Sequence, residues 1–294
     1  MTPRDPDREG LIVRDGIRVA FDVYENGGPT LLLMPTWSIV HSRHWKAQIP
    51  YLARHFRVIT FDGRGNGRSD RPRDPDAYSD QEFIADAIAV LDATDTDQVV
   101  VAGVSLGGHW AAMLAGLRPD RILGTILIGA VTSLVPVSHP QRAAYSFDDE
   151  LATDEGWAKY NRHYWRRDYP GFAEFFFSQV FSEARSTKQQ EDAVSWALDT
   201  DPETLIYTHI AEGITGDAER KVLGSIRCPV LVIHGTDDQL WQVVAGIKLA
   251  EATGADLLLI EGGGHLPQAR DPVRVNLAMR EFVDRISGPA GARA

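Results

Sequence analysis

The stretch Val99–Gly108, VVVAGVSLGG, decides the fold of this 294-residue chain. Apolar residues typical of a buried strand lead into the spacing G-x-S-x-G, and the Ala/Leu-rich stretch His109–Leu117 follows with the composition of a helix. The glycines allow a sharp turn that holds Ser105 in a strained conformation at a helix N-terminus. This context favours a nucleophilic serine, the alternative being a small-residue turn that only packs a helix on a strand.

Similar apolar runs recur along the chain. Their nearly continuous Val, Ile and Leu content predicts parallel strands buried on both faces, and helical periodicity lies between most of them. Residues 11–24 predict a hairpin around Asp15-Gly16, and Asp271-Pro272 begins a final helix. We therefore predict an α/β fold with a doubly wound, mostly parallel, eight-stranded sheet. The runs are Thr30–Met34, Arg57–Phe61, Val99–Ala102, Thr125–Ile128, Pro229–Ile233 and Leu257–Ile260.

The alternation of strands and helices is interrupted between residues 131 and 220. This region contains 14 of the aromatic side chains, of which the whole chain has 7 Trp, 8 Tyr and 11 Phe. An insertion of this size in an α/β domain is usually functional. We predict a mostly helical cap at 131–220, inserted into a core formed by 10–130 and 221–288. About a third of its aromatic residues should face a cavity, and the others should form the cap's own core.

Composition excludes several classes of function. A net charge of −11 disfavours nucleic acid as a partner, and no apolar run is long enough to span a membrane. Cys228 is the single cysteine, so no intrachain disulfide can form and no Cys/His cluster has zinc spacing. Because the start, MTPRDPDREG, is polar, we do not expect it to be a signal peptide. We predict a cytoplasmic protein that acts on a small molecule without metal or cofactor, its oligomeric state left open.

Two later strand ends carry candidate partners for the serine. His234–Asp238, HGTDD, follows one apolar run, and a carboxylate there can reach the same edge of the sheet. The spacing of three residues from Gly235 favours Asp238 as this carboxylate and leaves Asp237 as a solvated turn residue. The last run is followed by Gly262–His265, GGGH, where the glycines let the loop bend His265 toward this edge. A structural loop histidine is the alternative.

The order Ser105, Asp238, His265 resembles that of the α/β-hydrolase fold superfamily. The resemblance covers roughly residues 10–288. It includes Phe61–Asp70, similar to the family's D-x-R-G-x-G-x-S-D loop, and Ile226–Gly235, similar to its I-x-x-P-x-L-x-x-x-G strand. It implies that the serine is the nucleophile, the histidine its general base and the aspartate the group that orients the histidine. It says little about the substrate.

The resemblance also implies an oxyanion hole, made by the amide of Leu106 and an amide near the end of the first parallel strand. The family's usual His-Gly is missing there, since the chain reads Met34–Ser38, MPTWS. Pro35 has no N–H, which leaves Ser38 or Trp37 as the donor. We further expect three side chains to contact the substrate: Trp241, His109 and Trp165.

These features predict a serine hydrolase that cleaves a carboxylic ester, or a related acyl bond, of an apolar small molecule through an acyl-enzyme. The same three residues would also serve a thioesterase, a lactonase or a C–C bond hydrolase, or a ligand-binding protein with very slow turnover. Four arginines are interleaved with aspartates, and we predict a solvated face of ion pairs there rather than an anion site. They are Arg64, Arg68, Arg71 and Arg73.

Overall fold

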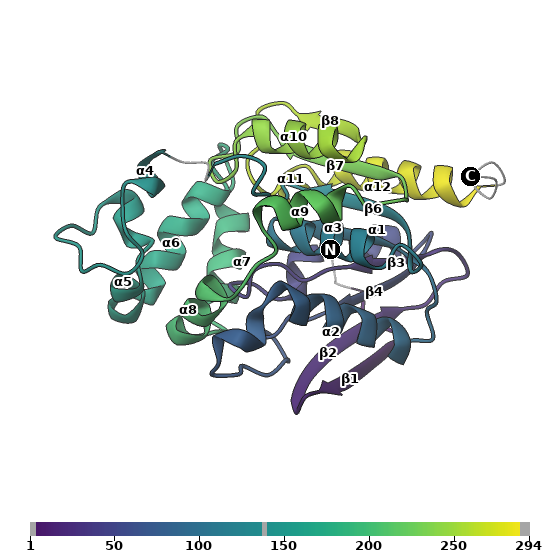
Figure 1. The fold of residues 1–294 in the computed structure, drawn as a ribbon, viewed down its shortest axis with the longest axis horizontal. Coiled ribbons are helices and arrows are strands. Elements are labelled where there is room, and N and C mark those ends of the chain that lie inside the picture. Colours follow the sequence, from purple (N-terminus) through teal and green to yellow (C-terminus); the bar gives the residue numbers. More distant parts are fainter. Residues whose placement is uncertain (1–3, 137–139, 289–294) are drawn as a thin grey trace.

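A computed structural model describes residues 4–136 and 140–288 and contains one eight-stranded sheet, ordered β1-β2-β4-β3-β5-β6-β7-β8 (Figure 1). β2 pairs antiparallel with β1 and β4, and all the other neighbours are parallel. The predicted fold class is therefore confirmed. The strands are β1 (Arg8–Arg14), β2 (Ile17–Tyr24), β3 (Thr30–Leu33), β4 (Arg57–Phe61), β5 (Val99–Val104), β6 (Ile122–Ile128), β7 (Val230–Gly235) and β8 (Asp256–Ile260).

Helices cover both faces of the sheet. In β5, Val99 and Val101 join one hydrophobic core with α2, α3 and α10, whereas Val100 and Val104 join a second core with α1 and α12. This two-residue period on two buried faces explains the continuous apolar composition of the strands. The helices of the two layers are α1 (Ile49–Leu52), α2 (Asp80–Ala93), α3 (Leu106–Leu117), α10 (Val243–Thr253) and α12 (Pro272–Ser287).

The inserted helices gather at one side of the sheet (Figure 1). Four of them, α5 to α8, share a third hydrophobic core, rich in aromatic rings, with Ile39, Val40 and Leu240 of the loops beneath, whereas α9 packs against α3 and its Leu223 joins the first core. The helices are α4 (Pro140–Ala143), α5 (Arg162–Arg167), α6 (Tyr169–Val180), α7 (Thr187–Ala197), α8 (Pro202–Ile210) and α9 (Gly216–Leu223). The predicted boundary at residue 220 falls inside α9, and residues 137–139 of the predicted cap lie outside the described part of the chain.

Short elements complete the chain: α11 (Pro267–Arg270) and the 3-10 turns η1 (Ser42–Trp45), η2 (Pro75–Tyr78) and η3 (Gly156–Lys159). Among the residues that the structure describes, none of the helices has both the length and the apolar character needed to cross a membrane.

Candidate active site

Ser105 lies on the sharp turn between β5 and α3. Its φ of 54° and ψ of −120° are unfavourable for a residue with a side chain, which is the strain that the motif predicts. The flanking glycines are required by close packing: a Cβ on Gly103 would lie 2.0 Å from the carbonyl oxygen of Gly107, and one on Gly107 would lie 2.0 Å from that of Pro35. The turn therefore depends on residues without side chains.

Three side chains from three strand ends meet at this turn. The Oγ of Ser105 lies 2.8 Å from Nε2 of His265, and Nδ1 of His265 lies 2.8 Å from Oδ2 of Asp238. The carboxylate can only accept, so Nδ1 carries the proton and Nε2 is free to accept the serine hydroxyl proton. Asp237, the other candidate acid, is exposed to solvent.

The Asp238 carboxylate is held in place by four contacts. Oδ1 accepts the amides of Leu240 and Trp241 at 2.7 and 2.9 Å, while Oδ2 faces His265 and, at 3.3 Å, Nε2 of His234. Burial alone would raise the pKa of Asp238, but its interaction with His265 and the hydrogen bonds of both histidines hold this pKa well below its usual range. The group stays ionised and fixed in orientation.

His234 is a neighbour of Asp238 that the sequence analysis did not predict. It is fully buried at the end of β7, and its Nε2 donates to the carbonyl oxygen of Trp241 at 2.7 Å. This bond fixes the loop that carries Asp238. Its only signal in the sequence is a histidine at a strand end, four residues before the aspartate.

The segment expected to supply an oxyanion amide lies beside the serine turn. Thr36 Oγ1 donates to the carbonyl of Val104 at 2.8 Å, and both Trp37 and Ser38 line the same cavity as Ser105. Leu106 is the first residue of α3, where the amide has no acceptor within the helix. Trp37 and Ser38 therefore both remain candidates for the second amide of the oxyanion hole.

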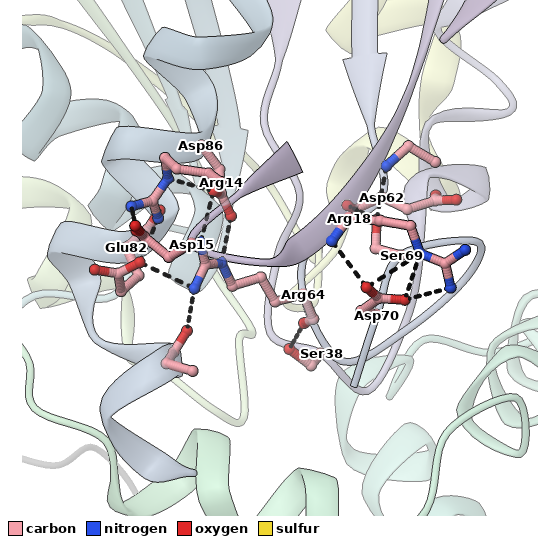
Figure 2. A network of polar contacts seen from close by, with 12 residues as sticks. Arg14, Asp15, Arg18, Ser38, Asp62, Arg64, Ser69, Asp70, Glu82 and Asp86 are labelled. Carbon is pink, nitrogen blue, oxygen red and sulfur yellow. Dashed lines mark hydrogen bonds and ion pairs between the residues drawn. The ribbon is translucent and has the colours of Figure 1, made fainter. Parts of the chain in front are cut away.

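The loop after β4 supports this segment. Ser38 Oγ donates to the carbonyl of Arg64 at 2.6 Å, and Asn66 Nδ2 donates to the carbonyl of Ser38 at 2.9 Å. Arg64 is 1% exposed, and its guanidinium binds Asp86 through Nε at 2.5 Å and Glu82 at 2.9 Å (Figure 2). The predicted ion pairs are present at Arg64, Arg68 and Arg73, but those of Arg64 are buried rather than solvated. Arg71 instead donates to backbone carbonyl oxygens.

A cavity of about 360 Å³ opens over the serine, a size that suits a small organic molecule. Its walls are mostly apolar and come from the core, from the Trp37 and Trp241 loops and from the cap. Of the cap's aromatic residues, Tyr160 and Phe176 contribute, fewer than the predicted third, because most of the others form the cap's own core.

The three predicted substrate contacts have different positions. Trp241 and His109 line the cavity. Trp165 does not: it is fully buried in the aromatic core of the cap, and its ring centre lies 5.9 Å from that of Trp37 and 4.5 Å from that of Phe172. The cap needs large side chains to fill its own interior, and Trp165 serves that purpose.

His109 belongs to a buried charged cluster one helical turn after the serine. Its Nε2 lies 2.9 Å from Oδ2 of Asp80, and its Nδ1 lies 3.8 Å from Oε1 of Glu219. Burial lowers the pKa of His109, but the two carboxylates outweigh this effect and raise it to about 9. The imidazole is therefore a cation at neutral pH, between two acids.

The same two carboxylates bind both connections between the core and the cap. Glu219 accepts from Thr132 Oγ1 at 2.7 Å and from the amide of Ser133 at 2.8 Å. Asp80 accepts from the amide of Ile214 at 2.6 Å. The cluster thus joins the helix that carries Ser105 to the two chain segments that lead into and out of the cap. Because its members are distant in sequence, no local pattern predicts it.

A strained serine, a histidine and a buried carboxylate at successive strand ends, beneath inserted helices, define the architecture of an α/β hydrolase. The chain belongs to the α/β-hydrolase fold family, whose model, described as "alpha/beta hydrolase fold", matches residues 26–272. It is therefore a hydrolase of this fold.

Three similar proteins show the range of the family. The chain is 30% identical to the "Putative carbamate hydrolase RutD" of Pseudomonas syringae pv. syringae, covering 82% of this chain and 88% of that protein. It is 25% identical to the 2-hydroxymuconate semialdehyde hydrolase of Pseudomonas sp. CF600, covering 92% of each. Esterase RhEst1 from Rhodococcus sp. ECU1013 superposes with a TM-score of 0.76 at 25% identity, covering 94% of this chain and 98% of that one.

Proposed function

We propose that the protein is a serine hydrolase that cleaves a carboxylic ester, or a related acyl bond, of an apolar small molecule through an acyl-enzyme. The observation that carries this proposal is the unbroken chain of hydrogen bonds from Ser105 through His265 to Asp238, 2.8 Å at each step. The serine is the attacking group, the histidine its general base and the aspartate the group that orients the base.

In the first half of the reaction, Ser105 Oγ attacks the carbonyl carbon while its proton moves to Nε2 of His265. Asp238 stabilises the resulting imidazolium by accepting from Nδ1. The amide of Leu106 and the amide of Ser38 or Trp37 would stabilise the oxyanion, each such donor typically lowering the barrier by about 3–4 kcal/mol. The histidine then gives its proton to the leaving oxygen as the carbon–oxygen bond breaks.

In the second half, His265 takes a proton from water, which attacks the acyl carbon. The bond to Ser105 Oγ breaks, the proton returns to the serine and the free acid leaves. The apolar walls of the cavity favour an apolar body for the substrate.

The same geometry would serve a thioester, a lactone or a C–C bond. The C–C reaction is the second candidate, because the relative named as a 2-hydroxymuconate semialdehyde hydrolase covers 92% of this chain. A carbamate is a further candidate substrate, because the relative that is 30% identical is named as a putative carbamate hydrolase. Turnover rates measured with an ester, a thioester, a lactone, a carbamate and a C–C substrate would show which type of bond the protein cleaves.

The decisive experiment compares turnover of p-nitrophenyl esters by the wild type and by Ser105→Ala. We expect the variant to lose at least about 10³-fold in kcat, since removing the attacking group leaves only binding and the oxyanion donors. Asp237→Asn is the matched control and should keep wild-type rates. Equal rates for wild type and Ser105→Ala would refute the proposal. If Ser105 reacts with a fluorophosphonate but the unlabelled protein completes only one turnover of the ester, a slow ligand-binding protein would be favoured instead.

A further inference from the structure

The cavity over Ser105 has a cation in its wall that no carboxylate of the described residues neutralises. Arg142, on α4, lines this cavity and is half-buried. Among the described residues, no acidic side chain is close enough to form an ion pair with it. The three arginines of the adjacent helix α5 all have such partners: Arg162 with Asp148, Arg166 with Glu203 and Arg167 with Asp154.

The Arg142 side chain is held against an aromatic wall. Its guanidinium carbon lies 4.1 Å from the centre of the Tyr160 ring, a distance at which the ring face attracts the cation. Tyr160 is hydrogen-bonded in turn to Nδ1 of His209 at 3.1 Å. The guanidinium is therefore positioned by its neighbours, while within 4–136 and 140–288 no carboxylate binds its N–H groups.

The positive charge of Arg142 acts inside the cavity. Burial lowers the pKa of His209, which also lines the cavity, and the charges of Arg142 and Arg162 add to this effect, bringing the pKa to about 3. This part of the wall is thus a neutral imidazole and a phenol next to a cation. Such a surface favours a bound anion over a second cation.

The other charged groups around the cavity do not cancel this preference. Asp80 and His109, which line the cavity, form an ion pair with each other at 2.9 Å. Glu219, 3.8 Å from His109, accepts hydrogen bonds from the segment that leads into the cap and does not line the cavity. Glu212 also lines the cavity, but it is exposed, so that water screens its charge. Arg142 is therefore the half-buried charge that gains most from a partner in the ligand.

We propose that the substrate is an acyl compound with a carboxylate of its own, separate from the bond that is cleaved, and that Arg142 binds this carboxylate. The inference rests on the proposed serine-hydrolase function. Arg142 comes from α4 in the cap and Ser105 from the turn that precedes α3 in the core (Figure 1), so the carboxylate that Arg142 binds would be a different group from the carbonyl that Ser105 attacks. The apolar walls would hold the chain or ring that joins them.

The first experiment uses two p-nitrophenyl esters of equal chain length, the valerate and the mono-ester of glutarate, which differ by a terminal carboxylate. We expect the wild type to have the higher kcat/KM for the glutarate. Arg142→Gln should lower the ratio of the two kcat/KM values by about ten- to a hundredfold, the range that a charge-assisted hydrogen bond is typically worth. Arg142→Lys should keep part of the ratio, and Arg166→Gln, outside the cavity, should keep all of it.

A second experiment measures binding without catalysis. Ser105→Ala is titrated with 4-phenylbutyrate and with its amide, and binding is followed by the intrinsic tryptophan fluorescence, to which Trp37 and Trp241 in the cavity wall contribute. We expect the acid to bind at least tenfold more tightly, and Arg142→Gln to remove this difference.

The outcomes separate this inference from the proposed function. Turnover that depends on Ser105 but has the same glutarate-to-valerate ratio in wild type and Arg142→Gln would overturn the inference and leave the hydrolase proposal standing. Arg142 would then only pack on Tyr160. Rates that do not depend on Ser105 would overturn the proposed function, and the titration would still decide whether Arg142 binds carboxylates.

Discussion

Replacing His109 by glutamine tests the buried charged cluster beneath the cap. In the wild type, the imidazolium lies between Asp80 and Glu219, at 2.9 and 3.8 Å. Glutamine is similar in length but carries no charge, so the two carboxylates would face each other without a cation. We expect the variant to be less stable than the wild type at neutral pH.

The expected magnitude follows from the pKa of His109, which is raised from 6.5 to about 9 in the folded protein. Because the folded-state pKa is the higher one, the stabilising contribution is complete below pH 6.5 and is lost as the pH rises through about 9. A difference of this size corresponds to about 3 kcal/mol in the free energy of unfolding. The lowered pKa values of Asp80 and Glu219 reflect the same contacts and are not added to it.

The assay is urea unfolding of wild type and His109→Gln between pH 6 and pH 10. Other groups titrate in this range, but their effects cancel in the difference between the two proteins. We expect that difference to shrink by about 3 kcal/mol from pH 6 to pH 10. If the two stability profiles run parallel over this range, His109 is not a cation in the folded protein and the reasoning is wrong.

Three further substitutions test other parts of the structure. Asp238→Asn should lower kcat by about 10⁴-fold, because the amide no longer fixes the histidine tautomer, whereas Asp237→Asn should keep the wild-type kcat. A loss of less than about tenfold for Asp238→Asn in p-nitrophenyl ester assays would contradict the role of Asp238. Asp86→Ala should lower the free energy of unfolding by about 1.5–3 kcal/mol, because the buried Arg64 loses one of its two carboxylate partners, and a loss below about 1 kcal/mol in urea would count against this ion pair. Gly107→Ala should destabilise by about 1–3 kcal/mol or more, since the new Cβ meets a carbonyl oxygen at 2.0 Å, and an unchanged melting temperature would disprove that close contact.

The sheet could be predicted from the sequence because its strands carry their own signal. The strands β3 to β7, buried on both faces, are nearly continuous apolar runs, the outer hairpin is marked by Asp15-Gly16, and all eight predicted strands are present. The turn at Ser105 was also local, encoded by glycines that the close packing requires. The structure brings Asp238 and His265 to this turn, and their catalytic role stays a prediction.

The contacts that sequence reasoning missed join elements far apart in the chain. Arg64 lies in a stretch of alternating charges, typical of a solvated face, but Asp86 on α2 and Arg14 on β1 meet there only after folding (Figure 2). His109 gave no local sign of its partners on α2 and α9. Trp165 was misplaced because composition does not distinguish an aromatic ring that lines a cavity from one that fills a core.

The hydrogen bonds from Glu219 and Asp80 to the two connecting segments limit how this protein can be recombined with its relatives. A chimera that exchanges the inserted helices at junctions within 132–133 or 214–219 would separate these acids from the backbone amides and hydroxyl groups that they bind. Junctions placed after 134 and before 212 would keep all of those partners with the parent core. The exchangeable unit is therefore smaller than the insertion itself.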